Sequence, residues 1–245
     1  MIDTHAHLDA LDDPGAAVAR ALEAGVTRIL TVGTTIDGGR KALDLADRHD
    51  GVYAIVGIHP HEAADEGDRA GELRELLRHP RAVAVGETGL DFYRDYAPRD
   101  RQLDLFEAEL EVARETGKPV VIHTRAAETE TAAALERFEG TVVLHCFSSA
   151  ALLPVALERD YYVSFAGNVS FPKATELRLA ATQVPADRLL AETDTPYLAP
   201  QPVRGGRNEP AYVIHTLAAL AVARGDDVAE LEAQIDVNAT AAFGL

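Results

Sequence analysis

Short apolar runs alternate with amphipathic stretches along the whole chain. Runs such as 120–123 (VVIH) and 142–145 (VVLH) are almost uninterrupted, which is typical of strands buried on both faces of a parallel sheet. The pattern predicts strands at 2–7, 27–32, 52–57, 82–86, 119–123, 141–146, 161–165 and 188–193. Helices are predicted between them, at 14–24, 37–49, 69–78, 99–116, 128–138, 149–158, 173–182 and 210–224.

The stretch 99–116 has a particularly clear helical pattern. Apolar residues recur there at intervals of three and four, which predicts one buried stripe made of Leu103, Phe106, Leu110 and Ala113. The acidic residues between them are predicted to face solvent, namely Glu107, Glu109 and Glu111.

Eight alternating strand and helix units within 245 residues match the number and length of a (β/α)8 barrel, a TIM-barrel fold. We expect a single domain, 1–245, because no low-complexity segment or Pro/Gly-rich linker divides the chain. A doubly wound open sheet is the alternative. We rank it lower because its ligand site would gather near one switch point, whereas the candidate ligands follow several different strands. The residues after 225 are predicted to form two extra short C-terminal helices outside the barrel.

The charge balance is strongly acidic. The chain has 40 acidic and 23 basic residues, a formal net charge of -17. Such self-repulsion favours solubility but destabilises the compact state unless salt screens it, which suggests a salt-rich, halophile-like cytoplasm. The balance disfavours a simple basic-patch DNA binder, because phosphate affinity normally comes from Lys and Arg.

Cysteine usage and hydropathy bear on location. The single Cys146 excludes an intramolecular disulfide framework, which agrees with a cytoplasmic protein. No run is long and apolar enough to span a bilayer. Two candidate ligands already occur in the first seven residues, so we expect no cleavable signal peptide. We therefore predict a cytoplasmic location and no membrane partner; a monomer is compatible with the pattern, which leaves the oligomeric state open.

Six polar residues stand where five of the predicted strands end. They are His5, His7, Glu87, His123, His145 and Asp194. In a barrel the carboxyl ends of all strands meet at one mouth. His5 and His7 are two residues apart, so both point to the same face of their strand. A satisfied core histidine could explain one of the apolar runs that end in His123 and His145, but not both together with the first pair.

Two carboxylates complete this set. Glu87 follows the run AVAVG, and a buried carboxylate there needs a strong positive partner, of which a divalent metal is the simplest. A helix cap or a salt bridge is the alternative. Asp194 follows Glu192 by two positions, so strand alternation aims both the same way. Either could instead cap a turn before Pro196; beside the histidines, we expect Asp194 to bind metal and Glu192 to lie behind the ligands.

Mixed imidazole and carboxylate ligands suit Zn, Mn, Co or Fe better than Mg or Ca. Six ligands exceed what one open catalytic site usually takes, so we predict two divalent ions, with Zn, Mn, Co and Mg as candidates, that share a bridging carboxylate. Glu87 is the bridging candidate. A water held between two metals loses its proton near neutral pH and becomes a nucleophile. Asp194 could orient this water and accept its proton as general base.

The chain resembles the TatD family of metal-dependent hydrolases within the wider amidohydrolase-like barrels. The resemblance covers essentially the whole chain and rests on several motifs in the same order: IDTHAHLD, VGIHPHEA, VGETGLDFYRDYAPRDRQ, KPVVIHTRAAETET, LHCFSS, FAGNVSF, LLAETDTPYLAP and RGGRNEP. Ser149 and Pro172 depart from the family pattern near the expected substrate side, which weakens inference about the substrate more than about the metals.

The resemblance implies a TIM barrel that cleaves DNA phosphodiesters with divalent metals, as an exonuclease on single strands or ends. By motif position, one metal would be held by His5, His7, Glu87 and Asp194, and the other by Glu87, His123 and His145. A carboxylic ester or amide hydrolase, such as an aminoacyl-tRNA deacylase, is the alternative among enzymes. A catalytically silent metal-binding barrel is the alternative from another class.

Four further residues are candidates for substrate binding. His59 follows the third predicted strand and could contact a scissile phosphate or an extra cation; a loop histidine bonded to backbone is the alternative. Arg125 follows His123 by two positions and could fork onto a phosphate, or pair with Glu128. Arg204 and Arg207 lie in a glycine-broken loop after the eighth strand, where barrels often bind phosphate. Two aromatic residues after the fourth strand could stack on bases or merely pack the loop, namely Phe92 and Tyr93.

Overall fold

Eight parallel strands form one sheet in the computed structural model, which describes residues 1–66, 69–94 and 96–245. Neighbouring strands pair in sequence order, from the first to the eighth, and the sheet curls into a nearly closed barrel. The strands are β1 (Ile2–Ala6), β2 (Arg28–Gly33), β3 (Val52–Val56), β4 (Ala82–Asp91), β5 (Val120–Arg125), β6 (Val142–Leu144), β7 (Tyr162–Phe165) and β8 (Leu189–Ala191). The predicted (β/α)8 architecture is thereby confirmed.

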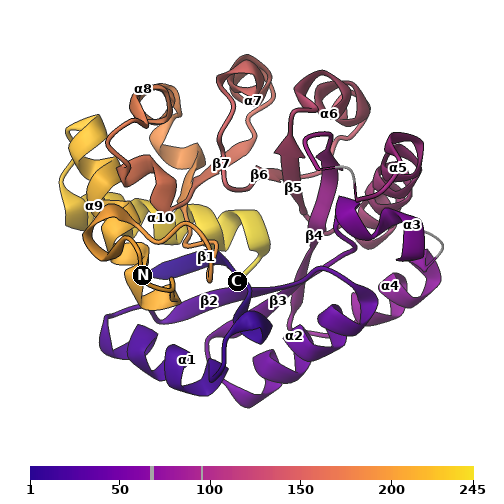
Figure 1. The fold of residues 1–245 in the computed structure, drawn as a ribbon, viewed down its shortest axis with the longest axis horizontal. Coiled ribbons are helices and arrows are strands. Elements are labelled where there is room, and N and C mark those ends of the chain that lie inside the picture. Colours follow the sequence, from indigo (N-terminus) through magenta and orange to yellow (C-terminus); the bar gives the residue numbers. More distant parts are fainter. Residues whose placement is uncertain (67–68, 95) are drawn as a thin grey trace.

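Helices surround the strands on the outside, and Figure 1 shows the ring that they form. They are α1 (Pro14–Glu23), α2 (Ile36–Arg48), α3 (Ala63–Glu66), α4 (Ala70–Leu76), α5 (Arg99–Thr116), α6 (Glu128–Leu135), α7 (Leu153–Glu158), α8 (Thr175–Gln183), α9 (Val213–Arg224) and α10 (Val228–Phe243). Local chemistry sets several of their ends. The Asp13 carboxylate accepts from the Ala16 N–H at the start of α1, and α5 ends at Gly117 in the left-handed conformation.

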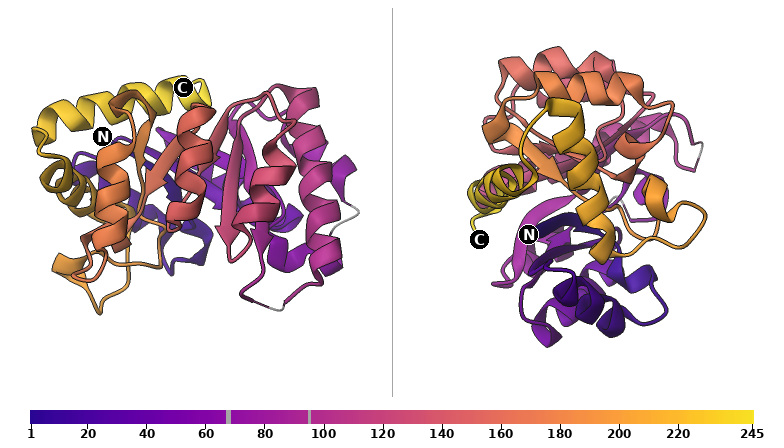
Figure 2. Two further views of the ribbon diagram at one scale, coloured as in Figure 1. Left: turned by 90° about the horizontal axis from the view of Figure 1, so that it is seen from above. Right: turned by 90° about the vertical axis from the view of Figure 1, so that its left-hand side faces the viewer.

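The C-terminal segment differs from the prediction of two short helices, because 228–243 forms the single helix α10. No glycine or proline interrupts this segment, Asp227 caps its start and Gly244 ends it. The helix lies across the amino-terminal end of the barrel, opposite the loops that follow the strands (Figure 2, left). There the Asn238 amide donates to the carbonyls of Ala186 and Leu189, at the start of β8.

The buried face of α5 also differs from the prediction. Leu103 is 39% exposed, whereas Glu109 is fully buried. The predicted stripe was one position out at Leu103, because Gln102 takes the buried place in that turn; Leu105 is also buried, beside Phe106. Glu109 is buried because its carboxylate meets hydrogen-bond donors of β4 and of the loop after β3, a contact that helical periodicity does not report.

The barrel closes between β1 and β8 without a regular ladder. The described contact is one isolated bridge, between Ala6 and Thr195. Two further backbone bonds join this seam, from the His7 N–H to the Thr195 carbonyl (2.8 Å) and from the Asp194 N–H to the His5 carbonyl (2.9 Å). Both bonds lie at the carboxyl end of the strands, where the candidate ligands gather.

Buried side chains seal the rest of this seam. Asp3 accepts hydrogen bonds from the backbone N–H (2.9 Å) and the hydroxyl (2.6 Å) of Thr193. The Thr4 hydroxyl donates to the Ala191 carbonyl (3.1 Å). Polar side chains thus replace part of the missing ladder. Across the described part of the chain, every helix is too short or too polar to cross a membrane.

Candidate metal centre

The six predicted ligands gather at the mouth of the barrel. Five of them stand near or just beyond the carboxyl end of a strand, and Glu87 lies within the longer strand β4. His5 belongs to β1 and His7 follows it, Glu87 belongs to β4, His123 to β5, His145 follows β6, and Asp194 follows β8. Left-handed backbone at Cys146 (φ 44°) and Asp194 (φ 58°) turns the chain sharply after two of these strands.

The Glu87 carboxylate is the centre of the cluster, and it is 3% exposed. Its Oε1 lies 2.9 Å from His123 Nδ1 and 3.0 Å from His145 Nε2. On the same oxygen, His59 Nε2 approaches to 3.4 Å. Its Oε2 lies 3.4 Å from His5 Nε2 and 3.7 Å from His7 Nε2. Five imidazoles therefore surround one carboxylate.

The donor atoms form three overlapping groups, in each of which all atoms lie within 4.8 Å of one another. The groups are His5, Glu87 and His145; His5, His7 and Asp194; and His59, Glu87 and His123. His59, which the sequence suggested as a substrate contact, thus lies among the metal-binding donors. Its position after β3 had suggested an extra cation as one possible ligand, but not the approach to Glu87, because that contact joins separate elements.

The state of His5 supports a bound cation. The residue is fully buried, and among residues 1–66, 69–94 and 96–245 neither of its ring nitrogens has a hydrogen-bond partner. A buried imidazole without partners is costly, and a metal ion would satisfy its nitrogen. Burial also lowers the pKa of His5, so the ring is held in the neutral form that coordinates metals. The residues present fit a divalent ion.

Electrostatics keep the central carboxylate charged. Burial alone would raise the pKa of Glu87, but the imidazoles of His145, His59 and His123 hold it well below its ordinary value. For His145 the balance runs the other way. Burial would lower its pKa, whereas Glu87 and Glu192 raise it well above the ordinary value. The negative charge of the cluster is therefore centred on Glu87, whose carboxylate would help to hold a divalent ion.

Two buried carboxylates stand behind the ligands. Glu192 Oε1 lies 3.0 Å from His145 Nδ1 and accepts from the Cys146 N–H (2.7 Å). It thus orients the His145 ring, in the place expected for it. Asp91 Oδ2 lies 3.3 Å from His123 Nε2 and 2.9 Å from His61 Nε2. The sequence analysis missed Asp91, although it follows Glu87 by an even number of residues within β4.

The predicted arginines lie on the rim. The Arg125 guanidinium sits 4.0 Å from the Tyr93 ring centroid, and that of Arg204 sits 3.6 Å from the Phe171 ring centroid. Arg207 contacts the segment after β1. Its Nη1 lies 2.8 Å from the Asp12 carboxylate, and its Nη2 donates to the Ala10 carbonyl. Arg125 and Arg204 are exposed and can reach a ligand at the mouth.

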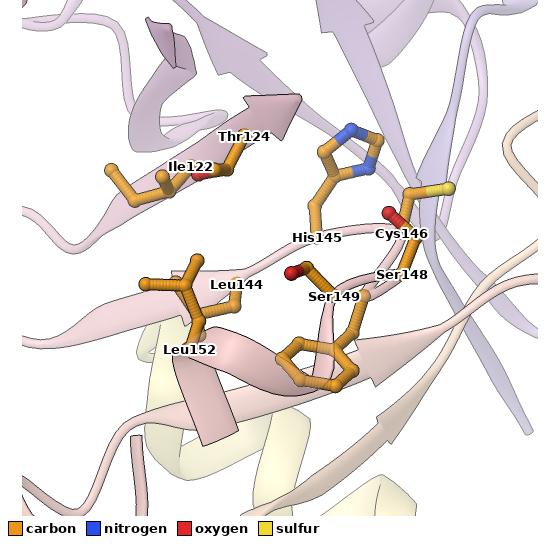
Figure 3. Close-up of a pocket in the computed structure, with 9 residues that line it drawn as sticks. Ile122, Thr124, Leu144, His145, Cys146, Ser148, Ser149 and Leu152 are labelled. Carbon is orange, nitrogen blue, oxygen red and sulfur yellow. The ribbon is translucent and has the colours of Figure 1, made fainter. Parts of the chain in front are cut away.

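A small pocket lies beside the centre, next to His145 (Figure 3). Its volume is about 10 Å³, which leaves room for one water at most. Thr124 and Ser149 line it, and the Cys146 thiol points away from it (Figure 3). A polymeric or bulky substrate does not fit in this pocket.

Comparisons with known proteins identify the family of this chain. The family model described as TatD related DNase matches residues 2–244. An uncharacterized metal-dependent hydrolase TatD from Mycobacterium tuberculosis is 41% identical over 100% of this chain and 98% of its own. A 3'-5' ssDNA/RNA exonuclease TatD from Erwinia amylovora is 38% identical over 95% of this chain and 94% of its own.

A solved structure is also similar over the whole chain. The crystal structure of YJJV, a TatD homologue from Escherichia coli, matches with a TM-score of 0.93 and 30% identity, covering 100% of this chain and 98% of that one. The fold, the convergence of histidines on Glu87 and these matches lead to one assignment. The chain belongs to the TatD family of metal-dependent hydrolases.

Proposed function

We propose that this protein is a nuclease that hydrolyses phosphodiester bonds of DNA, as an exonuclease on unpaired strands. The observation that carries the proposal is the single Glu87 carboxylate among five imidazoles at an open mouth. A relative of 38% identity bears the name of a single-strand DNA and RNA exonuclease, which supports the choice of substrate.

Two divalent ions are part of this proposal. One would be held by His5, His7, Glu87 and Asp194, and the other by Glu87, His123 and His145. Glu87 would belong to both sets of ligands, because its two oxygens face different histidines. His59 stands close enough to Glu87 and His123 to add a ligand. Bound divalent ions supply Lewis-acid stabilisation of charge that develops on the phosphate.

The chain's own residues supply the remaining steps. Asp194 Oδ1 lies 3.6 Å from His7 Nε2, and its side chain is 13% exposed, so water can reach it. We assign it as the general base that accepts the proton of the attacking water. Glu192 keeps the His145 ring in place, and Arg125 donates to a non-bridging phosphate oxygen.

The decisive experiment follows end-labelled single-stranded DNA with the protein reconstituted in Mn²⁺ or Mg²⁺ across a salt series. Wild type should shorten the strand stepwise, and Asp194→Asn should be slower by about 100-fold or more, as expected for loss of a general base. Asp160→Asn is the matched control, because Asp160 also has left-handed backbone (φ 54°) but precedes β7 at the other end of the barrel.

The other outcomes reject the proposal in different ways. Equal activity of wild type and Asp194→Asn would point to a contaminating nuclease or another site. Turnover of an aminoacyl ester without DNA cleavage would favour the ester hydrolase. Bound metal with no turnover of either substrate would identify a silent metal-binding barrel.

A further inference from the structure

The strongly exposed aromatic side chains of the described chain all follow the carboxyl ends of strands, at one end of the barrel. Among its large exposed hydrophobic residues, the aromatic ones are Tyr93, Tyr96 and Tyr197, which are 65%, 63% and 60% exposed. Tyr93 and Tyr96 lie in the segment after β4, and Tyr197 lies after β8. All three therefore stand at the mouth, on two sides of the metal centre.

The rings contact residues of the centre or its rim. The Tyr197 ring meets His7 edge-on, with ring centroids 6.1 Å apart, and the Tyr96 ring meets His61 in the same way at 4.7 Å. Tyr93 carries the Arg125 guanidinium over its face. These tyrosines thus present aromatic surface to solvent within reach of the hydrolytic centre.

Residues of the site also fix the backbone of two of these tyrosines, Tyr197 through a main-chain carbonyl and Tyr93 through a carboxylate. The Tyr197 N–H donates to the Asp194 carbonyl (2.8 Å). The Tyr93 N–H donates to Asp91 Oδ1 (3.0 Å), and the other oxygen of Asp91 bonds His123 and His61. Their backbones therefore hold defined positions relative to the ligands, which restricts where the rings can lie and lowers the entropy lost when a ligand stacks on them.

An aromatic face next to an arginine is the combination that unpaired nucleotides use, since the base stacks and the phosphate meets the guanidinium. Paired bases inside a duplex do not expose such faces. We propose that Tyr197 and Tyr93 are stacking platforms for unpaired bases on the two sides of the scissile phosphate, with Arg125 holding the adjoining backbone. This inference rests on the proposed nuclease function and specifies how its substrate is recognised.

The test compares Tyr197→Leu and Tyr93→Leu with wild type on single-stranded oligonucleotides that are intact or abasic near the cleaved end. Each variant should raise KM for the intact strand by about 5- to 100-fold, the range for loss of one stacked base. On the strand that is abasic at the matching position, variant and wild type should agree. Tyr162→Leu is the control, because Tyr162 also pairs with an arginine, Arg188, but begins β7 at the far end.

A binding measurement separates this inference from the nuclease proposal. A 2-aminopurine oligonucleotide should lose fluorescence on wild-type protein and keep it with Tyr197→Leu; the chain contains no tryptophan to interfere. Cleavage with unchanged KM in both tyrosine variants would overturn the stacking platforms and leave the nuclease intact. Fluorescence loss without any cleavage would overturn the nuclease and leave the platforms standing. Absence of fluorescence loss with wild type would reject the platforms.

A second inference comes from the buried Glu109 of α5. Its Oε1 accepts from the Ile58 N–H (2.8 Å), and the Thr88 hydroxyl donates to its Oε2 (2.5 Å). Ile58 precedes His59, and Thr88 follows Glu87. We infer that Glu109 is a positioning residue. Through Ile58 and Thr88 it keeps His59 and Glu87, two of the metal-binding donors, in place relative to each other.

Titration calorimetry with Mn²⁺ tests this role independently of any substrate. Glu109→Leu should weaken metal binding by about 10- to 100-fold, the usual cost of removing a group that supports ligands. Glu109→Gln, which can still accept from Ile58 and donate to Thr88, should restore it. Thr88→Val removes one bond alone and covers the case in which Glu109→Leu fails to fold. Wild-type affinity in Thr88→Val and in a folded Glu109→Leu would overturn the inference, as would a Glu109→Gln that rescues nothing.

Discussion

Buried carboxyl groups of this barrel differ in whether their surroundings favour the charged form. Glu87 is charged because imidazoles surround it, whereas Asp3 has only neutral donors, from His5 and Thr193. Burial raises the pKa of Asp3 to about 8, although these hydrogen bonds oppose the rise. Two buried acids of the same barrel thus have opposite preferences, which local sequence does not reveal.

Asp3 leads to a prediction for stability against pH. Its pKa of about 8 in the folded protein exceeds the ordinary 3.8. Between these values the folded state binds a proton that the unfolded state lacks, so stability falls as pH rises and levels off above about 8. The slope from this group is at most about 1.4 kcal/mol per pH unit.

Asp3→Asn should remove that slope while keeping hydrogen bonds at the seam. Urea unfolding of metal-free protein from pH 5 to 9 measures the difference between variant and wild type. A constant difference over this range would show that Asp3 does not change protonation on folding.

Residue types and spacing suffice to predict the donors around Glu87, because each follows an apolar strand and strands of a barrel share one mouth. The same reasoning does not find Asp91 or the burial of Glu109. Their partners lie on other elements, and such contacts depend on how helices and loops pack. His59 is the intermediate case, since its place at the mouth was predicted but its approach to Glu87 was not.

At the level of elements, the strands were predictable because buried parallel strands have continuous apolar runs. The C-terminal helix was not, since the extent of α10 depends on the Asp227 cap and on packing across the end of the barrel. Its Asn238 is 2% exposed and bonds two carbonyls near the start of β8.

Asn238→Ala should therefore destabilise the protein by about 2 kcal/mol, because it leaves buried carbonyls without donors. Chemical denaturation measures this loss. Metal affinity should stay at the wild-type value, since α10 lies at the end of the barrel opposite the metal centre. Val237→Ala is the control, because the neighbouring Val237 is 62% exposed and should change stability little. Equal stability of Asn238→Ala and wild type would mean that α10 is not held through this amide.

For the whole molecule, the excess of acidic residues is the dominant property. Many arginines are already paired at the surface, such as Arg40 with Asp37 and Glu72, and Arg69 with Glu66 and Glu72. Such exposed pairs contribute little, while the net charge of -17 repels itself across the surface.

Salt should therefore raise the thermal midpoint of the metal-free protein between about 0.1 and 1 M KCl, as the screening length falls from about 10 to 3 Å. Scanning calorimetry across this range tests the expectation. A midpoint that falls steadily with salt would mean that the surface ion pairs outweigh the repulsion. Binding of DNA should weaken over the same range, because released counterions no longer favour association.

The seam between β1 and β8 gives the ligand arrangement a further consequence. Elsewhere neighbouring strands are joined by ladders, but here one isolated bridge, two backbone hydrogen bonds and a few side chains join the first strand to the last. A metal ion bound by His5 and His7 on one side and by Asp194 on the other would join the two sides of this gap. Catalysis and the closure of the barrel would then depend on the same ion. Loss of the metal would therefore abolish activity and also weaken the contact between the first and the last strand.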